Sequence, residues 1–141
     1  MLDKAISIAV KAHTGQLDKG GKPYILHPLH VMMQMDTEEE RITAILHDVL
    51  EDSSVSLVTL CLVGIPTTVV NALSILARKK GQSYREYIKD ISENKLATKV
   101  KIADLEHNMD LSRIPNPTKK DYDRIAKYKT HYDYLKSIKE K

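Results

Sequence analysis

The sequence contains one cysteine, no phenylalanine and no tryptophan among its 141 residues. Because Cys61 has no partner, an intrachain disulfide is excluded, and a reducing cytoplasm is the expected location. Seven tyrosines supply all of the aromatic content. The hydrophobic core is therefore predicted to be aliphatic, built from Leu, Ile, Val, Met and Ala.

Long apolar runs are also missing. No stretch approaches the roughly 18 apolar residues that a transmembrane helix needs, so no membrane partner is predicted. The chain opens directly into an amphipathic pattern at Met1-Leu2-Asp3-Lys4, without the apolar centre of a signal peptide. The net charge is only +3, which does not require a nucleic-acid partner but would accommodate an anionic small-molecule substrate.

Helical periodicity runs through most of the chain and predicts an all-α fold. Apolar residues recur at helical spacing over residues 2–14, and a loop rich in Gly and Pro follows from Gly15 to Pro28. This loop carries His27, and a short helix is expected after Pro28. A helix is predicted to start at the Thr37/Glu40 capping box and to carry His47 and Asp48. Another follows the serines within residues 53–56 and stops near Gly64. Further helices are predicted from Pro66 to about Arg78, after a start at Ser83, from about Lys95 to Met109, and from Asp121 to Lys139. No repeat or linker divides the chain, so residues 1–141 are predicted to form one domain.

The most informative pattern is the pair His47-Asp48 followed directly by Glu51-Asp52 in an apolar helical context. Ionisable groups are costly to remove from water unless they are paired or bind a metal. Adjacent His47 and Asp48 can both reach one ion, and Glu51 lies one helical turn further on. Such an arrangement suits a metal-activated water with a carboxylate beside it for proton transfer.

Two other segments offer matching groups. His27 precedes Pro28, and Asp104 shares a helix face with Asn108 at a spacing of four residues. Together with His47 and Asp48, they would give a site of two imidazoles and two carboxylates. Mixed nitrogen and oxygen ligands suit Mn, Fe or Zn better than Ca, and they leave positions for water and a substrate oxygen.

Four stretches resemble one known family when they are taken together. They are AHTGQ at residues 12–16, KGGKPYILHP at 19–28, LHDVLED at 46–52 and KIADLEHNM at 101–109. In this order they resemble the hydrolase domain of the RelA/SpoT alarmone enzymes, a branch of the HD-domain metal hydrolases. The chain is most similar to the small alarmone hydrolases, which include the metazoan SpoT homologue.

The resemblance implies an all-α HD-domain bundle of roughly seven to eight helices. It implies Mn²⁺, or another divalent transition metal, and hydrolysis of the 3′-pyrophosphate of guanosine tetra- and pentaphosphate to GDP or GTP and pyrophosphate. Because 141 residues leave no room for a synthetase domain, the expected activity is hydrolysis without synthesis. By position, the metal ligands would be His27, His47, Asp48 and Asp104. The acidic pair that handles the attacking water would be Glu51 and Asp52. The substrate contacts would be Lys19 and Asn108.

One position departs from the family pattern. The family usually has an arginine just before the lysine of the first loop, and this chain has Asp18 there. A carboxylate cannot replace a planar cation over a nucleobase. Asp18 is expected to face the base or ribose, and Asp18→Arg is then expected to lower KM. Asp18 permits one alternative, a phosphohydrolase acting on a different nucleotide. A second alternative is a catalytically silent nucleotide-binding regulatory module, against which the intact Glu51-Asp52 pair argues.

Overall fold

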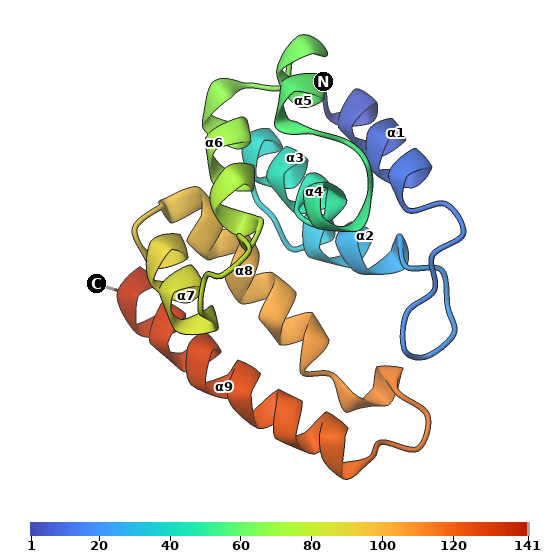
Figure 1. Cartoon of the computed structure of the whole chain (residues 1–141), viewed down its shortest axis with the longest axis vertical. Coiled ribbons are helices and arrows are strands. Elements are labelled where there is room, and N and C mark those ends of the chain that lie inside the picture. The colour runs from blue at the N-terminus through green and yellow to red at the C-terminus, as the bar shows by residue number, and fades with distance from the viewer. Residues whose placement is uncertain (141) are drawn as a thin grey trace.

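The computed structural model describes residues 1–140, which are helical apart from their connections and one isolated β-bridge between Leu17 and Pro23 (Figure 1). Eight helices have six or more residues, and α4 is a single turn, so the all-helical prediction is confirmed. None of the described helices is both long and apolar enough to cross a membrane. The α-helices are α1 (Leu2–Ala12), α2 (Leu26–Met33), α3 (Glu38–Leu46), α4 (Val49–Asp52), α5 (Leu57–Leu62), α6 (Thr67–Leu76), α7 (Tyr84–Ser92), α8 (Lys95–Asn108) and α9 (Lys119–Lys139), with a 3-10 helix, η1 (Leu111–Arg113), between α8 and α9.

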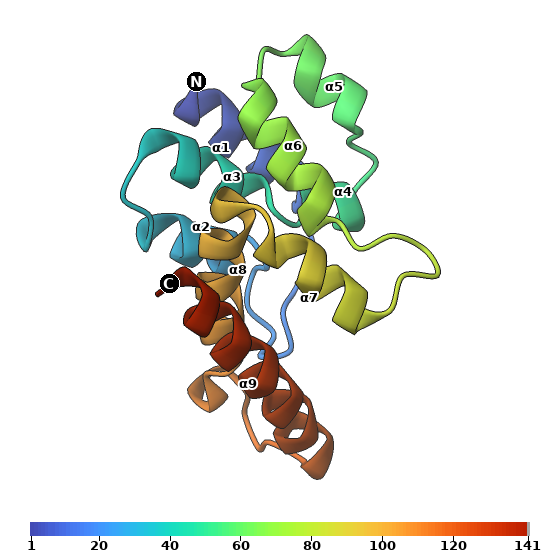
Figure 2. The same ribbon diagram turned by 90° about the vertical axis from the view of Figure 1, so that its left-hand side faces the viewer.

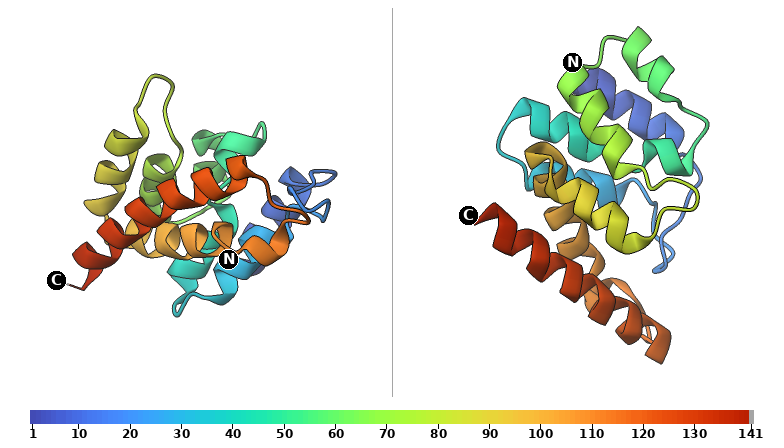
Figure 3. Two further views of the ribbon diagram at one scale, coloured as in Figure 1. Left: turned by 90° about the horizontal axis from the view of Figure 1, so that it is seen from below. Right: turned by 60° about the vertical axis from the view of Figure 1, so that its left-hand side comes forward.

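Helices α3 and α8 form the centre of the arrangement. Helix α3 packs against α1, α2, α6 and α8, while α8 also contacts α7 and α9. The long α9 lies across the lower side of the molecule, and α5 lies at the opposite end (Figures 1 and 2). The view from below shows α9 crossing beside α8, with the loop before α2 near η1 (Figure 3). This packing brings the ends of α2, α3 and α8 together.

The core between these helices is aliphatic, as predicted. Ile45, Leu73 and Leu105 are fully buried, and Tyr87 is the one aromatic residue among the buried hydrophobic residues of the described chain. The Tyr87 hydroxyl donates a hydrogen bond to the Leu76 carbonyl at 2.6 Å, which satisfies its polar end. Burying such aliphatic side chains stabilises the fold by about 1.5–3 kcal/mol each.

Helix α3 begins at the capping box that the sequence predicts. The Glu40 backbone N–H donates to Thr37 Oγ1 at 3.2 Å, and Glu40 Oε1 accepts from the Thr37 backbone N–H at 3.2 Å. A second capping box, formed by Thr118 and Asp121, starts α9 two residues earlier than expected. In each case the side chains satisfy backbone donors that the first helical turn leaves unpaired.

Two predicted boundaries at the site were wrong. Helix α3 ends at Leu46, so His47 and Asp48 lie between α3 and α4 and not inside one continuous helix. There, His47 Nδ1 donates to the Ala44 carbonyl, which takes up a carbonyl at the end of α3. In addition, α2 begins at Leu26, so His27 lies in its first turn. Pro28 fits that turn, because its missing N–H would have no helical partner there.

The Thr37 capping box is expected to be a measurable part of the stability of the fold. Thr37→Ala removes the acceptor for the Glu40 N–H and should lower the free energy of unfolding by about 1 kcal/mol in urea denaturation. Thr67→Ala is the control, because Thr67 is exposed at the start of α6 and its side chain makes no hydrogen bond within residues 1–140. Equal effects of the two substitutions would contradict a specific role for the cap.

Candidate metal centre

Four ionisable side chains from three segments converge at the centre of the molecule. His27 comes from α2, His47 and Asp48 from the α3–α4 junction, and Asp104 from α8. Each offers one ligand atom, and these atoms all lie within 4.8 Å of one another. Three of the side chains are buried and Asp48 is half-buried. The structure therefore brings together the four residues that the sequence singled out as metal ligands.

The closest contacts in this cluster join imidazole nitrogens to carboxylate oxygens. His27 Nε2 lies 2.8 Å from Asp104 Oδ1, and His47 Nε2 lies 3.0 Å from Asp48 Oδ2. His47 Nε2 is also 3.3 Å from Asp104 Oδ1. One nitrogen of each ring and one oxygen of each carboxylate thus face a common point.

The remaining nitrogen of each ring is engaged elsewhere, which orients both rings and places a proton on Nδ1 of His47. His47 Nδ1 lies 2.6 Å from the Ala44 carbonyl, so it must carry the proton that it donates. His27 Nδ1 lies 2.8 Å from His107 Nδ1. Burial, together with the nearby charge of Arg113, lowers the pKa of His107 to about 4, so His107 is neutral and one of the two rings donates to the other. A metal bound at the cluster would take the Nε2 lone pair of each ring, and His47 would then be neutral.

Each carboxylate is held by a neighbour that the sequence analysis did not identify. Tyr24 Oη donates to Asp48 Oδ2 at 2.6 Å. Lys101 Nζ donates to Asp104 Oδ2 at 2.8 Å, one helical turn away on α8, and lies 5.2 Å from the centre of the Tyr87 ring. The three-residue spacing of Lys101 and Asp104 was the available signal for that pair.

Electrostatics explain how these largely buried groups coexist. Burial would lower the pKa of His47, but the charges of Asp48 and Asp104 raise it well above 6.5. Burial would raise the pKa of Asp48, but the positive charge of His47 lowers it to about 2. The pKa of Asp104 is also low, because Lys101 and His47 outweigh its burial. A protonated His47 between two carboxylates occupies the place of a cation.

This donor set fits a divalent transition metal. Two imidazole nitrogens and two carboxylate oxygens suit Mn, Fe or Zn, and their second partners already orient them. The negative charge of the two carboxylates favours a cation there once His47 has lost its proton. We conclude that the four residues can hold one metal ion.

The acidic pair lies on α4, next to this cluster. Burial and the neighbouring charge of Asp48 raise the pKa of Asp52. Glu51 is exposed, and its Oε1 accepts a hydrogen bond from the Arg78 backbone N–H at 2.5 Å. Glu51 makes no hydrogen bond to the four-residue cluster in the described chain. Asp52 therefore shares the electrostatic environment of the cluster more closely than Glu51 does.

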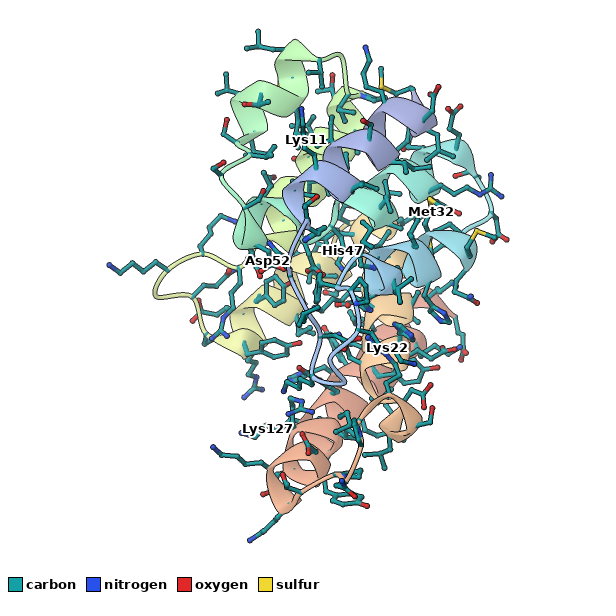
Figure 4. All side chains as sticks on the ribbon, turned by 90° about the vertical axis from the view of Figure 1, so that its right-hand side faces the viewer. Lys11, Lys22, Met32, His47, Asp52 and Lys127 are labelled. Atoms are coloured by element: carbon teal, nitrogen blue, oxygen red, sulfur yellow. The ribbon has the colours of Figure 1, made fainter. Side chains whose placement is uncertain are left out.

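The Ala12–Gln16 stretch fastens α4 to the end of α1. His13 is buried, and its Nδ1 donates to Gln16 Oε1 at 2.8 Å. Gln16 Nε2 in turn donates to the Asp52 backbone carbonyl at 2.8 Å. The loop and the acidic pair are thereby linked. In Figure 4 the labelled His47 lies in the middle of the molecule, between Lys11 on α1 and Lys22 on the loop.

A pocket of about 360 Å³ opens between the loop, η1 and α9. It brings together three residues that the sequence predicts to contact substrate, namely Asp18, Lys19 and Asn108. Sequence reasoning did not include Arg113 and Arg124, which also line it. The remaining lining residues are Leu17, Gly20, Tyr24, Asp110, Ile114 and Tyr128.

The carboxylate of Asp18 is turned into its own loop. Its Oδ1 accepts hydrogen bonds from the backbone N–H groups of Gly20 and Lys22, both at 2.9 Å. Its Oδ2 lies 3.8 Å from Arg113 Nη2. The side chain therefore lines the pocket with Oδ1 engaged by its own loop and Oδ2 toward Arg113.

The raised pKa of His47 predicts a pH-dependent metal site. Below that pKa the metal must displace a proton, so Mn²⁺ affinity should fall by up to about tenfold per unit of decreasing pH. Isothermal titration calorimetry in buffers of different ionisation enthalpy measures the affinity and the proton release together. His47→Ala should remove tight binding, and a variant that keeps a full metal complement would exclude His47 as a ligand.

Comparison with known proteins adds relatives to this geometry. No family model matches the chain. It is 30% identical over 127 residues to a GTP pyrophosphokinase of Myxococcus xanthus, and the aligned region covers 77% of this chain and 17% of that protein. It is 44% identical over 57 residues to a guanosine-3′,5′-bis(diphosphate) 3′-pyrophosphohydrolase of Borreliella burgdorferi, and here the aligned region covers 37% of this chain and 8% of that protein. The chain spans less than a fifth of the length of these curated relatives.

A solved structure shares the fold. It is described as a metazoan orthologue of SpoT that hydrolyses ppGpp, and it matches 95% of this chain and 84% of its own with a TM-score of 0.78. Sequence identity is 22%, so this likeness establishes the architecture alone. In sequence, therefore, the chain is similar to the RelA/SpoT proteins, and in architecture it shares the all-helical fold of their metazoan orthologue.

Proposed function

We propose that the chain is a metal-dependent phosphohydrolase that removes the 3′-pyrophosphate from guanosine tetra- or pentaphosphate. The balanced reaction consumes one water and yields GDP or GTP with pyrophosphate. The observation that carries this proposal is the cluster of His27, His47, Asp48 and Asp104 close to a pocket with basic side chains. The similarity to RelA/SpoT proteins supports the choice of substrate. Residues 1–141 would act as one domain.

The four-residue cluster would hold the metal, with Mn²⁺ as the proposed ion. Such an ion supplies Lewis acidity for the attack of water on phosphorus. Contacts of the opposite ring nitrogens with the Ala44 carbonyl and with His107 orient both histidines so that each Nε2 faces the cluster. Lys101 and Tyr24 hold the two carboxylates in place.

Asp52 and Glu51 would accept and move the proton of the attacking water. Partial burial and the charge of Asp48 raise the pKa of Asp52, which makes Asp52 a stronger base than a fully solvated aspartate. Glu51 stands on the same helical turn, anchored through one oxygen to the Arg78 N–H. Its second oxygen makes no hydrogen bond within residues 1–140 and would take a water or a substrate group.

The pocket supplies positive charge for the phosphates of the substrate. Lys19 makes no salt bridge within residues 1–140, and its pKa is lowered by burial and by the nearby charge of Arg124. Two cations that repel one another favour an anion between them. Asn108 lines the same pocket and donates to the ligand candidate Asp104, which links substrate binding to the metal site.

A second candidate is the same chemistry on a different nucleotide. Asp18, at the position where the family usually has arginine, favours this alternative because it offers no flat cationic surface to a guanine base. Measuring kcat/KM with Mn²⁺ over guanosine and adenosine nucleotides, with and without a 3′-diphosphate, distinguishes the two. The proposal predicts the highest value for guanosine tetraphosphate. A preference for a nucleotide without a 3′-phosphate would contradict it.

Glu51→Gln separates metal binding from proton transfer. The amide oxygen can still accept from the Arg78 N–H, while the basic carboxylate is lost. We expect metal content to be unchanged and kcat to fall by roughly 10²-fold or more. Glu86→Gln is a matched control, because Glu86 is exposed on α7 and forms no salt bridge in the described part of the chain. Near-normal turnover of Glu51→Gln would leave only a structural role for Glu51.

A further inference from the structure

Arg113 occupies a junction that the sequence gave no reason to single out. It ends η1, and its side chain is 22% exposed. Its Nη1 donates to the His107 carbonyl at 2.9 Å and lies 3.5 Å from Asn108 Oδ1. Its Nη2 lies 3.8 Å from Asp18 Oδ2. One planar cation therefore meets the loop before α2 and the end of α8 at the same time.

The backbone brings the same two segments into contact. A Cβ at Gly20 would lie 2.4 Å from the Arg113 carbonyl oxygen, closer than real side chains approach a backbone atom. Only glycine therefore permits the observed approach of the loop to η1. The Asp18–Arg113 ion pair and the Gly20 contact thus join the same two segments, one through side chains and one through the backbone.

Arg113 also sets the orientation of Asn108. The oxygen of the Asn108 amide faces Arg113, and its nitrogen donates to Asp104 Oδ1 at 3.0 Å. A flipped amide would place its N–H₂ against the guanidinium and its oxygen against the carboxylate, and both contacts would be repulsive. A continuous chain of polar contacts therefore runs from Asp18 through Arg113 and Asn108 to Asp104.

We infer that Arg113 is a positioning residue that couples the substrate loop, residues 15–23, to Asn108 and the metal ligand Asp104, with Asp18 as its anchor. This inference rests on the proposed function. It identifies the contacts through which an anionic nucleotide in the pocket would affect the metal ligand Asp104. Asp18 then acts through Arg113 and does not contact the base or ribose itself. The Asp18–Arg113 ion pair also positions Lys19, the next residue in the loop, to bind a substrate phosphate.

For Asp18→Arg, the expected change in KM is now opposite to the one that the sequence predicts. Asp18→Arg would remove both loop hydrogen bonds and place a second cation against Arg113. KM for guanosine tetraphosphate should therefore rise roughly tenfold, within the range of couplings measured for contacting residues. If residue 18 contacted the nucleobase directly, the same substitution would lower KM.

The test is a double-mutant cycle with kcat and KM measured for each protein. Asp18→Arg and Arg113→Asp are each expected to raise KM about tenfold, with a smaller change in kcat. The double variant restores the opposite charges and should recover much of the lost affinity. Gly20→Ala keeps both charges but separates the segments, so it should raise KM in the same direction. Additive effects in the double variant, or a lower KM for Asp18→Arg, would overturn the inference.

Two controls separate this inference from the proposed function and from misfolding. Arg85→Gln removes an exposed arginine on α7 that has no salt bridge within residues 1–140, and it should leave both constants unchanged. Mn²⁺ affinity without nucleotide reads the Asn108–Asp104 link independently of turnover, and Arg113→Gln should weaken it several-fold while Arg113→Lys weakens it less. If the wild-type protein hydrolyses no nucleotide, the proposed function fails, and unchanged Mn²⁺ affinity in Arg113→Gln then overturns the coupling as well.

Discussion

The structure depends on one electrostatic constraint, which is that two carboxylates and two imidazoles face one another in the interior. Asp48 and Asp104 would repel if nothing positive stood between them. In the metal-free protein a protonated His47 has that place, helped by the ammonium group of Lys101 on the outer side of Asp104. A divalent cation could take the place of the proton, because each ligand is already held by a second partner.

The surrounding fold can be understood as the frame that holds this cluster. Its ligands come from α2, the α3–α4 junction and α8, and these elements pack through an aliphatic core with Ile45 and Leu105 fully buried. The interruption of the helix after Leu46 turns His47 and Asp48 toward one point, where an unbroken helix would fan them about 100° apart. The close-packed aliphatic core keeps that geometry from relaxing.

Much of the fold and of the ligand cluster could be predicted from the sequence, because both depend on local residue patterns. Helical periodicity and the Thr37/Glu40 capping box located α3, and paired ionisable residues in apolar segments indicated the cluster. The hydrogen bonds that Tyr24 donates to Asp48 and that the Arg78 N–H donates to Glu51 could not be predicted from such patterns. Such contacts depend on how separate helices approach one another, which no spacing in the chain records.

The pocket shows the same limit more clearly. Asp18 stood out in the sequence as a departure from a family pattern, and its expected partner was the nucleotide. The structure pairs it with Arg113, which lies 95 residues away in the chain and belongs to no recognisable motif. A residue that departs from a family pattern can thus be matched by a distant residue, and only the three-dimensional arrangement shows which one.

The central claim is that this metal site directs water to the phosphorus of a 3′-pyrophosphate. Hydrolysis of guanosine tetraphosphate in ¹⁸O-labelled water, followed by mass spectrometry of the products, tests it most directly. The account predicts metal-dependent formation of GDP and pyrophosphate in equal amounts, with the label in pyrophosphate and none in the ribose hydroxyl. Release of orthophosphate, label in GDP, or turnover that persists after the metal is removed would contradict it.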